Sequence, residues 1–95
     1  MTDPVYRLFE TRQFQRDLDA LPPAEGARLA RKLKAFVYPL LRSDPHLGPW
    51  IKRLKGHEPV TWRFRVGAWR IFYAIDEGGR VVNLLGIALR RDAYR

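Results

Sequence analysis

The chain is short, apolar and strongly basic, and each property excludes a class of protein. With 95 residues, 46% of them hydrophobic, it can bury one core and is too apolar to be disordered, so a single domain over residues 1–95 is predicted. It has no cysteine and only two histidines, His46 and His57, which excludes a disulfide framework and predicts no metal site and no cofactor.

The net charge of +8 is concentrated in the second half of the chain. Residues 1–49 contain eight Lys and Arg against six Asp and Glu, whereas residues 50–95 contain ten against four, so the halves carry +2 and +6. This asymmetry predicts a polyanionic partner. The start of the chain lacks a secretory pattern, and no apolar segment approaches the roughly 20 residues of a membrane span, so a cytoplasmic protein is predicted.

The chain is predicted to begin with a strand and a helix. Residues 5–9 alternate in polarity, as a short strand does. Thr11 is the predicted N-cap of a helix in which Phe14, Leu18 and Leu21 recur at i, i+4 and i+7. The Pro-Pro pair that follows Leu21 ends this helix.

A second helix is predicted to follow. Pro23 suits its first turn, where a missing N–H has no consequence, and Pro39 is predicted to kink or end it. Its apolar stripe is predicted to comprise Leu29, Leu33, Phe36, Val37 and Leu40.

The second half is predicted to be mostly strand. Residues 42–50 are rich in turn formers and predict a loop, and residues 51–56 a short basic strand or strand start. Residues 62–75 alternate strictly about Gly67-Ala68, which predicts a hairpin with a two-residue turn. A second turn at 77–79 and a long strand at 80–89 follow, before a short tail.

These elements predict an α+β domain in the order β-α-α-β-β-β with a short C-terminal tail. Two N-terminal helices would pack on one face of a mostly antiparallel four-stranded sheet. Alternation then places Arg63, Arg65 and Arg70 on the other, open face. The helix-covered face is predicted to carry Trp62, Phe64, Ile71, Tyr73 and Ile75.

The open face is interpreted as a phosphate-binding surface. A two-residue turn places Arg65 directly opposite Arg70, and like charges that face each other across strands destabilise a sheet by roughly 0.2–1 kcal/mol. An anion between them would remove that repulsion, and the planar guanidinium binds phosphate oxygens bidentately. For an isolated arginine pair such as Arg63 and Arg65, a solvated surface is the alternative interpretation.

The segment before the hairpin supplies candidate RNA contacts. Lys52, Arg53 and Lys55 are candidate phosphate ligands, or equally ordinary surface residues. Trp50 follows Gly-Pro in the predicted loop and is a candidate for stacking on a base.

Three stretches in this order resemble the RelE/ParE superfamily of type II toxins. They are "KRLKG" (52–56), "WRFRVGAWRIFYAI" (62–75) and "RRDAY" (90–94), and the first strand and the two helices also fit. The resemblance implies a toxin neutralised by a cognate antitoxin, with operator DNA bound only together with that antitoxin. In the RelE branch it implies cleavage of mRNA in the ribosomal A site, in contact with ribosomal RNA; in the ParE branch it implies poisoning of DNA gyrase.

The RelE branch also implies catalytic residues. An arginine-rich surface would lower the pKa of a nearby tyrosine, so Tyr94 is the candidate base for the 2′-OH proton. Leu89 stands where many relatives have a histidine, so an imidazole is missing at that point. The catalytic residues implied by the resemblance are Arg63, Arg65, Arg70, Arg90 and Tyr94.

The sequence therefore predicts a ribosome-dependent, metal-free mRNA endoribonuclease of a type II toxin–antitoxin system. Two alternatives stay open. One is a ParE-like inhibitor of DNA gyrase, which needs no nuclease residues. The other is a catalytically silent relative that binds only its antitoxin and operator DNA.

Overall fold

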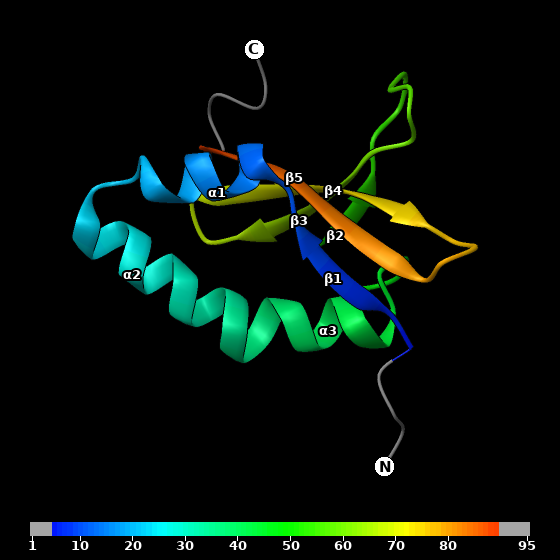
Figure 1. Ribbon diagram of the computed structural model, residues 1–95, viewed down its shortest axis with the longest axis horizontal. Helices are drawn as coiled ribbons and strands as arrows, with labels where there is room; N and C mark the ends of the chain where they lie inside the picture. The colour runs from blue at the N-terminus through cyan, green and yellow to red at the C-terminus, as the bar shows by residue number, and fades with distance from the viewer. Residues whose placement is uncertain (1–4, 90–95) are drawn as a thin grey trace.

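The computed structural model describes residues 5–89, which form a five-stranded sheet with helices on one face (Figure 1). The helices of this part of the chain are too short or too polar for a membrane crossing. The spatial order of the strands is β1-β5-β4-β3-β2. The elements are β1 (Arg7–Glu10), α1 (Arg12–Asp19), α2 (Pro23–Lys32), the π-helix η1 (Leu33–Val37), α3 (Tyr38–Ser43), β2 (Ile51–Arg53), β3 (Trp62–Val66), β4 (Trp69–Asp76) and β5 (Val81–Leu89).

The predicted fold, a four-stranded and mostly antiparallel sheet with N-terminal helices, is wrong in two respects. β2 is a separate edge strand, which gives the sheet five strands, and β1 pairs in parallel with β5, Arg7 beside Val81. The helices carry the chain from the β1 edge to the β2 edge, and the strands β2 to β5 then return as an antiparallel meander. β5 therefore arrives next to β1 in the same direction.

Local signals set the first turns of α1 and α2 as predicted, whereas α1 ends at Asp19, before Leu21 of the predicted helix. The Thr11 hydroxyl accepts a hydrogen bond from the Phe14 N–H at 3.2 Å, which satisfies one of the free N–H groups at the start of α1. Pro23 occupies the first turn of α2. Both signals depend only on residues close in sequence.

Pro39 does not end the second helix. α2, η1 and α3 form one continuous helical segment, and the turn before Pro39 widens so that the Tyr38 N–H donates to the Leu33 carbonyl, five residues back. A proline inside an α-helix removes one i→i−4 bond and clashes with the preceding turn. The π-helical turn is a known way for a helix to absorb such a break.

The same turn changes which side chains of this helix are buried. Leu29, Leu33 and the two further residues at spacings of four are buried, whereas Phe36 and Leu40 of the predicted stripe are 42% and 37% exposed. A spacing of four drifts around a regular α-helix by about 40° per step, and the wider π-helical turn offsets that drift. The buried positions are Leu29, Leu33, Val37 and Leu41.

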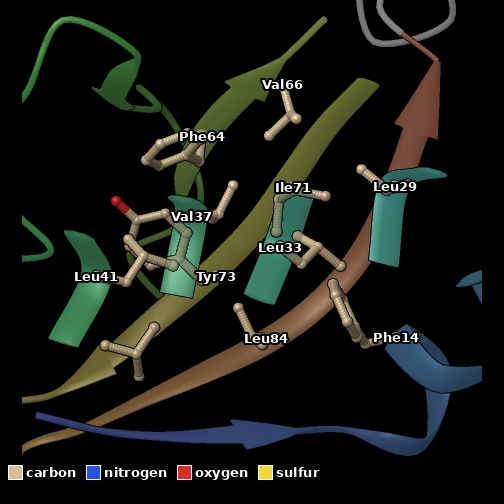
Figure 2. Close-up of a cluster of buried hydrophobic side chains, with 11 residues drawn as sticks. Phe14, Leu29, Leu33, Val37, Leu41, Phe64, Val66, Ile71, Tyr73 and Leu84 are labelled. Atoms are coloured by element: carbon tan, nitrogen blue, oxygen red, sulfur yellow. The ribbon is translucent and has the colours of Figure 1, made fainter. Parts of the chain in front are cut away.

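The core lies between the long helix and the sheet (Figure 2). Alternate residues of β3, β4 and β5 point from the sheet into this core, so the residues before and after each core residue along a strand lie on the opposite face. This confirms the predicted inward direction of Phe64, Ile71 and Tyr73. The buried cluster is Phe14, Leu29, Leu33, Val37, Leu41, Phe64, Val66, Ile71, Tyr73, Val82 and Leu84.

α1 is attached to β5 beyond the point where β1 ends. The Thr11 hydroxyl donates to the Leu84 carbonyl at 2.6 Å, and Asp17 Oδ2 accepts from the Ile87 N–H at 2.9 Å. The Asp17 carboxylate thus takes the place of a neighbouring strand. Gly86 lies beside it, because a Cβ at that position would be 2.9 Å from Asp17 Oδ2.

Candidate nucleic-acid interface on the arginine face

The β3–β4 hairpin fixes the position of the first pair of arginines. Val66 pairs with Trp69, so Gly67-Ala68 is the turn, and Gly67 has a φ of +56°, which a Gly-X turn requires of its first residue. Arg65 lies directly opposite Arg70, as predicted.

A second cross-strand pair of cations lies two residues further along β3. Lys52 of β2 pairs with Arg63, on the same face as Arg65. Four cationic side chains from three adjacent strands therefore share one face of the sheet, on the side away from the core. The arginine face is defined here by Lys52, Arg63, Arg65 and Arg70.

Arg70 is buried, which sequence alternation did not predict. Its exposed fraction is 3%, and it is the one charged residue in the described range that is buried, whereas Arg63 and Arg65 are half-buried. A guanidinium in such surroundings interacts more strongly with an adjacent anion than one in water does. The expectation of a fully open arginine cluster is therefore wrong for its central member.

Arg63 is oriented by the loop that precedes β2. Its Nη1 donates to the Trp50 carbonyl at 2.8 Å, and the Arg65 N–H donates to the same oxygen at 2.9 Å. The Trp50 ring packs edge-on against Phe36, with 4.9 Å between ring centroids, and is stacked over Phe64 at 6.2 Å. Trp50 is thus anchored to the core, and its stacking on a base stays a prediction.

The other predicted contacts lie outside the arginine face. Arg53 pairs with Trp62, so it leaves β2 toward the helix side, and Lys55 lies in the turn after β2; both are exposed. Arg90 and Tyr94 lie outside the described residues. Their roles, and those of Lys52, Arg53 and Lys55 in RNA binding, stay predictions.

Tyr73 is excluded as a general base by its position. It is fully buried, and its hydroxyl donates to the Pro45 carbonyl at 2.7 Å. Burial raises the pKa of the Tyr73 phenol well above its usual value. This agrees with the predicted direction of Tyr73 toward the core.

Sequence reasoning missed Phe72. In the sheet it lies between Arg63 of β3 and Gly86 of β5, and its half-buried side chain alternates with the core residues Ile71 and Tyr73. An aromatic ring therefore stands beside the cations in the middle of the sheet. The period-two pattern of residues 69–76 already contained this information.

His46 lies in the loop after α3 and forms a cluster with two carboxylates. Its Nε2 lies 2.7 Å from Glu77 Oε2 and its Nδ1 lies 3.1 Å from Asp44 Oδ1, while the Tyr6 hydroxyl donates to Glu77 Oε1 at 3.0 Å. The hydrogen bond to Glu77 raises the pKa of His46. Hydrogen bonds from His46 lower the pKa of Glu77 and of Asp44.

This cluster lies away from the arginine face and connects the loop after α3 to the β4–β5 turn. Residues 5–89 hold no group of three His, Cys, Asp or Glu side chains arranged to bind a metal ion. The charged side chains that the arginine face offers to a ligand are three guanidinium groups and one ammonium group.

Comparison with known proteins places these features in a family. The model of the ParE toxin of the parDE type II toxin–antitoxin system matches residues 9–94. Toxin RelE of Mycobacterium tuberculosis is 34% identical over 94 residues, which cover 98% of this chain and 90% of that protein.

Solved structures share the fold. The toxin–antitoxin complex RelBE2 from Mycobacterium tuberculosis matches with a TM-score of 0.67 and 28% identity, over 93% of this chain and 100% of that one. The archaeal RelE–RelB complex from Pyrococcus horikoshii OT3 matches with a TM-score of 0.64 and 23% identity, over 90% and 96%, which supports the fold alone.

Proposed function

The chain belongs to the RelE/ParE superfamily of type II toxins, and we propose that it is a ribosome-dependent mRNA endoribonuclease. The observation that carries this proposal is that two cross-strand cation pairs, Arg65 with Arg70 and Lys52 with Arg63, lie next to each other on one face of the sheet. Such a surface destabilises the sheet unless an anion occupies it. A phosphodiester is an anion that both arginines can bind at once.

The proposed reaction is an internal transesterification of RNA. The 2′-oxygen loses its proton and attacks the adjacent phosphorus, the bond from phosphorus to the 5′-oxygen breaks, and that oxygen takes up a proton. The products are a 2′,3′-cyclic phosphate and a 5′-hydroxyl. The phosphorane carries additional negative charge during the reaction, and Arg70 is assigned to stabilise it from its buried position.

The remaining roles follow the family resemblance. Arg63 and Arg65 hold the scissile phosphate together with Arg90, and Tyr94 accepts the 2′-OH proton. Leu89 at the end of β5 cannot transfer a proton, so much of the rate enhancement is assigned to orientation of the RNA. The ribosome supplies that orientation by holding the codon in the A site, with the basic residues Lys52, Arg53 and Lys55 near RNA phosphates.

The proposed partner of the free toxin in the cytoplasm is a cognate antitoxin. Both solved structures named above are complexes of a toxin with an antitoxin. The net charge of +6 on residues 50–95 favours an acidic segment that folds over the arginine face. Operator DNA would be bound only by the toxin–antitoxin complex.

A second candidate function is inhibition of DNA gyrase. It is favoured by one observation, the match of residues 9–94 to the ParE toxin model. A gyrase inhibitor binds a protein surface and does not need cation pairs aligned across three strands. The nuclease is therefore preferred.

Two assays separate these functions. Single-turnover cleavage of mRNA on programmed ribosomes should yield fragments with the cyclic phosphate ends described above. The same protein should leave the supercoiling activity of gyrase unchanged. Absence of cleavage together with inhibition of supercoiling would replace the nuclease by the gyrase inhibitor, and absence of both would indicate a catalytically silent relative.

A further inference from the structure

The arginine face continues across the sheet into a hollow that the proposed chemistry does not use. The hollow has a volume of about 400 Å³ and is formed by β1, the start of β5 and the end of β4. Its position follows from the register, because Arg7, Val81 and Asp76 lie side by side in one row and Phe9 and Asn83 in the next. The residues that line it are Arg7, Leu8, Phe9, Asp76, Val81 and Asn83.

We propose that this hollow binds one unpaired nucleobase of the RNA whose scissile phosphate lies at the arginine face. The proposal rests on the proposed nuclease function and extends it by a base-binding subsite. Single-stranded RNA is commonly recognised by aromatic side chains that stack on splayed bases and by amides that bond to the base edges. The hollow contains one residue of each kind, Phe9 and Asn83.

Phe9 supplies the stacking surface. It is 58% exposed although it belongs to a strand of the sheet, and it pairs with Asn83 of β5. A large apolar side chain on a sheet has lower free energy when covered, so a flat apolar ligand is favoured at this position. A base stacked on an aromatic ring contributes binding energy with little dependence on sequence.

Asn83 supplies the polar contact beside that ring. Its half-buried side chain makes none of the hydrogen bonds found within residues 5–89. An amide offers a donor and an acceptor together, which matches the adjacent donor and acceptor on a base edge.

The charge of the hollow favours a base over a phosphate. Arg7 and Asp76 both line its wall, in one row across Val81, so the hollow has no excess of positive charge, whereas the arginine face carries four cations for the phosphates. The path between the two sites runs along β4, where Phe72 and Ala74 face the same side as Arg70. From Arg70 to Asp76 this path is about 20 Å long, enough for several nucleotides.

The test measures stacking at equilibrium, independently of cleavage. Single-stranded RNA oligonucleotides that carry 2-aminopurine at successive positions are titrated with the toxin at low salt. Stacking on Phe9 should quench the fluorescence at one position in particular. Phe9→Ala should abolish this quenching and weaken binding by roughly 5- to 150-fold, the range expected for one lost base stack. Phe9→Trp should preserve both.

Leu47→Ala is the matched control, because Leu47 is also a large exposed apolar residue, 78% exposed, but lies in the loop after α3. It should bind RNA like the wild type. Asn83→Leu should weaken binding while leaving quenching by Phe9 at the same position. These two variants separate the hollow from a general loss of apolar surface.

Three results would overturn the proposal: no site-specific quenching, quenching that survives in Phe9→Ala, or a change in sedimentation coefficient caused by Phe9→Ala, which would make the hollow a contact between copies of the chain. Cleavage on programmed ribosomes is measured on the same proteins. If wild-type protein shows quenching that depends on Phe9 yet cuts no mRNA, the subsite stands and the nuclease function fails. If the wild-type protein cuts mRNA but Phe9→Ala has no effect on binding, the nuclease function stands and the subsite fails.

Discussion

Arg70 combines a central position on β4, burial and a like-charged neighbour across the strand. If its guanidinium stabilises the phosphorane, Arg70→Ala should lower the single-turnover cleavage rate by about 10²–10³ with a smaller effect on ribosome binding. Arg70→Lys should restore part of the rate, since it keeps the charge but not the bidentate fork. Thermal unfolding of each variant checks that the fold survives.

The control for this prediction is Arg12→Ala, since Arg12 is an exposed arginine at the start of α1. It removes one positive charge without touching the arginine face and should cleave at nearly the wild-type rate. Equal rates for Arg70→Ala and Arg12→Ala would show that Arg70 has no catalytic role.

Arg65 is expected to lower the stability of the sheet while contributing to cleavage. Its replacement by Thr removes the like charge opposite Arg70 and introduces a residue that suits a strand. The free energy of unfolding should rise by about 0.2–1 kcal/mol, whereas cleavage should fall. Urea denaturation of Arg65→Thr beside the wild type measures the first effect. A less stable variant would mean that Arg65 is primarily a structural residue.

At the scale of secondary-structure elements, the hydrogen bond from β5 to Asp17 of α1 allows a prediction about stability. Asp17 Oδ2 accepts from the Ile87 N–H, and a Cβ on residue 86 would stand 2.9 Å from that oxygen. Asp17→Ala should therefore destabilise the protein by about 1–3 kcal/mol, because it leaves a strand N–H without its charged acceptor. Gly86→Ala should act through the same bond by displacing the carboxylate.

A double-mutant cycle tests this shared cause. The double variant should be less destabilised than the sum of the two single variants. Calorimetric or urea unfolding of all four proteins gives the coupling. Additive effects would show that Gly86 is required for another reason.

How much of this architecture the sequence predicts depends on the distance over which each signal acts. The Thr11 cap and the Gly67-Ala68 turn were predictable because their partners are a few residues away. The pairing of β1 with β5 was not, since alternation reveals the face of a strand but not its neighbour. The same holds for the site. Alternation placed Arg65 opposite Arg70, but the burial of Arg70 and the contact of His46 with Glu77 depend on tertiary packing.

The cluster around His46 makes the stability of the domain depend on pH. The pKa of His46 is raised in the folded state by Glu77 first and Asp44 second. The contribution of His46 to the free energy of unfolding is therefore fully present below the unfolded pKa of about 6.5 and is lost as pH rises through the folded pKa. The pKa values of the two carboxylates are lowered, so their contribution is lost in acid. Among the described residues, the charged groups that face His46 are Asp44 and Glu77, and Arg80 lies near Tyr6 and Glu77.

The expected result is a pH-dependent difference in stability between the wild type and His46→Gln. The stability of the wild type relative to His46→Gln should be largest between about pH 5 and 6.5 and should decline toward about pH 8. His57→Gln is the control, because exposed His57 makes none of the hydrogen bonds or ion pairs found in residues 5–89. Unfolding midpoints across the pH range measure both. A stability difference that grows toward alkaline pH would contradict the assigned contacts.

The distribution of charge over the chain yields a prediction for the binding of RNA. The +6 of residues 50–95 includes the four cations of the arginine face, and neutralising phosphates with such residues releases counterions. The logarithm of the affinity for single-stranded RNA should fall linearly with the logarithm of salt concentration, with a slope of about −0.7 for each phosphate neutralised. If Lys52 contacts one phosphate, Lys52→Ala should make the slope less negative by about that amount at every RNA sequence.

Phe9→Ala should instead weaken binding without changing the slope, because a stacked base neutralises no phosphate. The measurement is anisotropy of a labelled RNA with a 2′-O-methyl group at the cleavage site, titrated between about 50 and 200 mM salt. An affinity that does not change over this range would remove the phosphate contacts from the proposal, and with them the reason for the paired arginines.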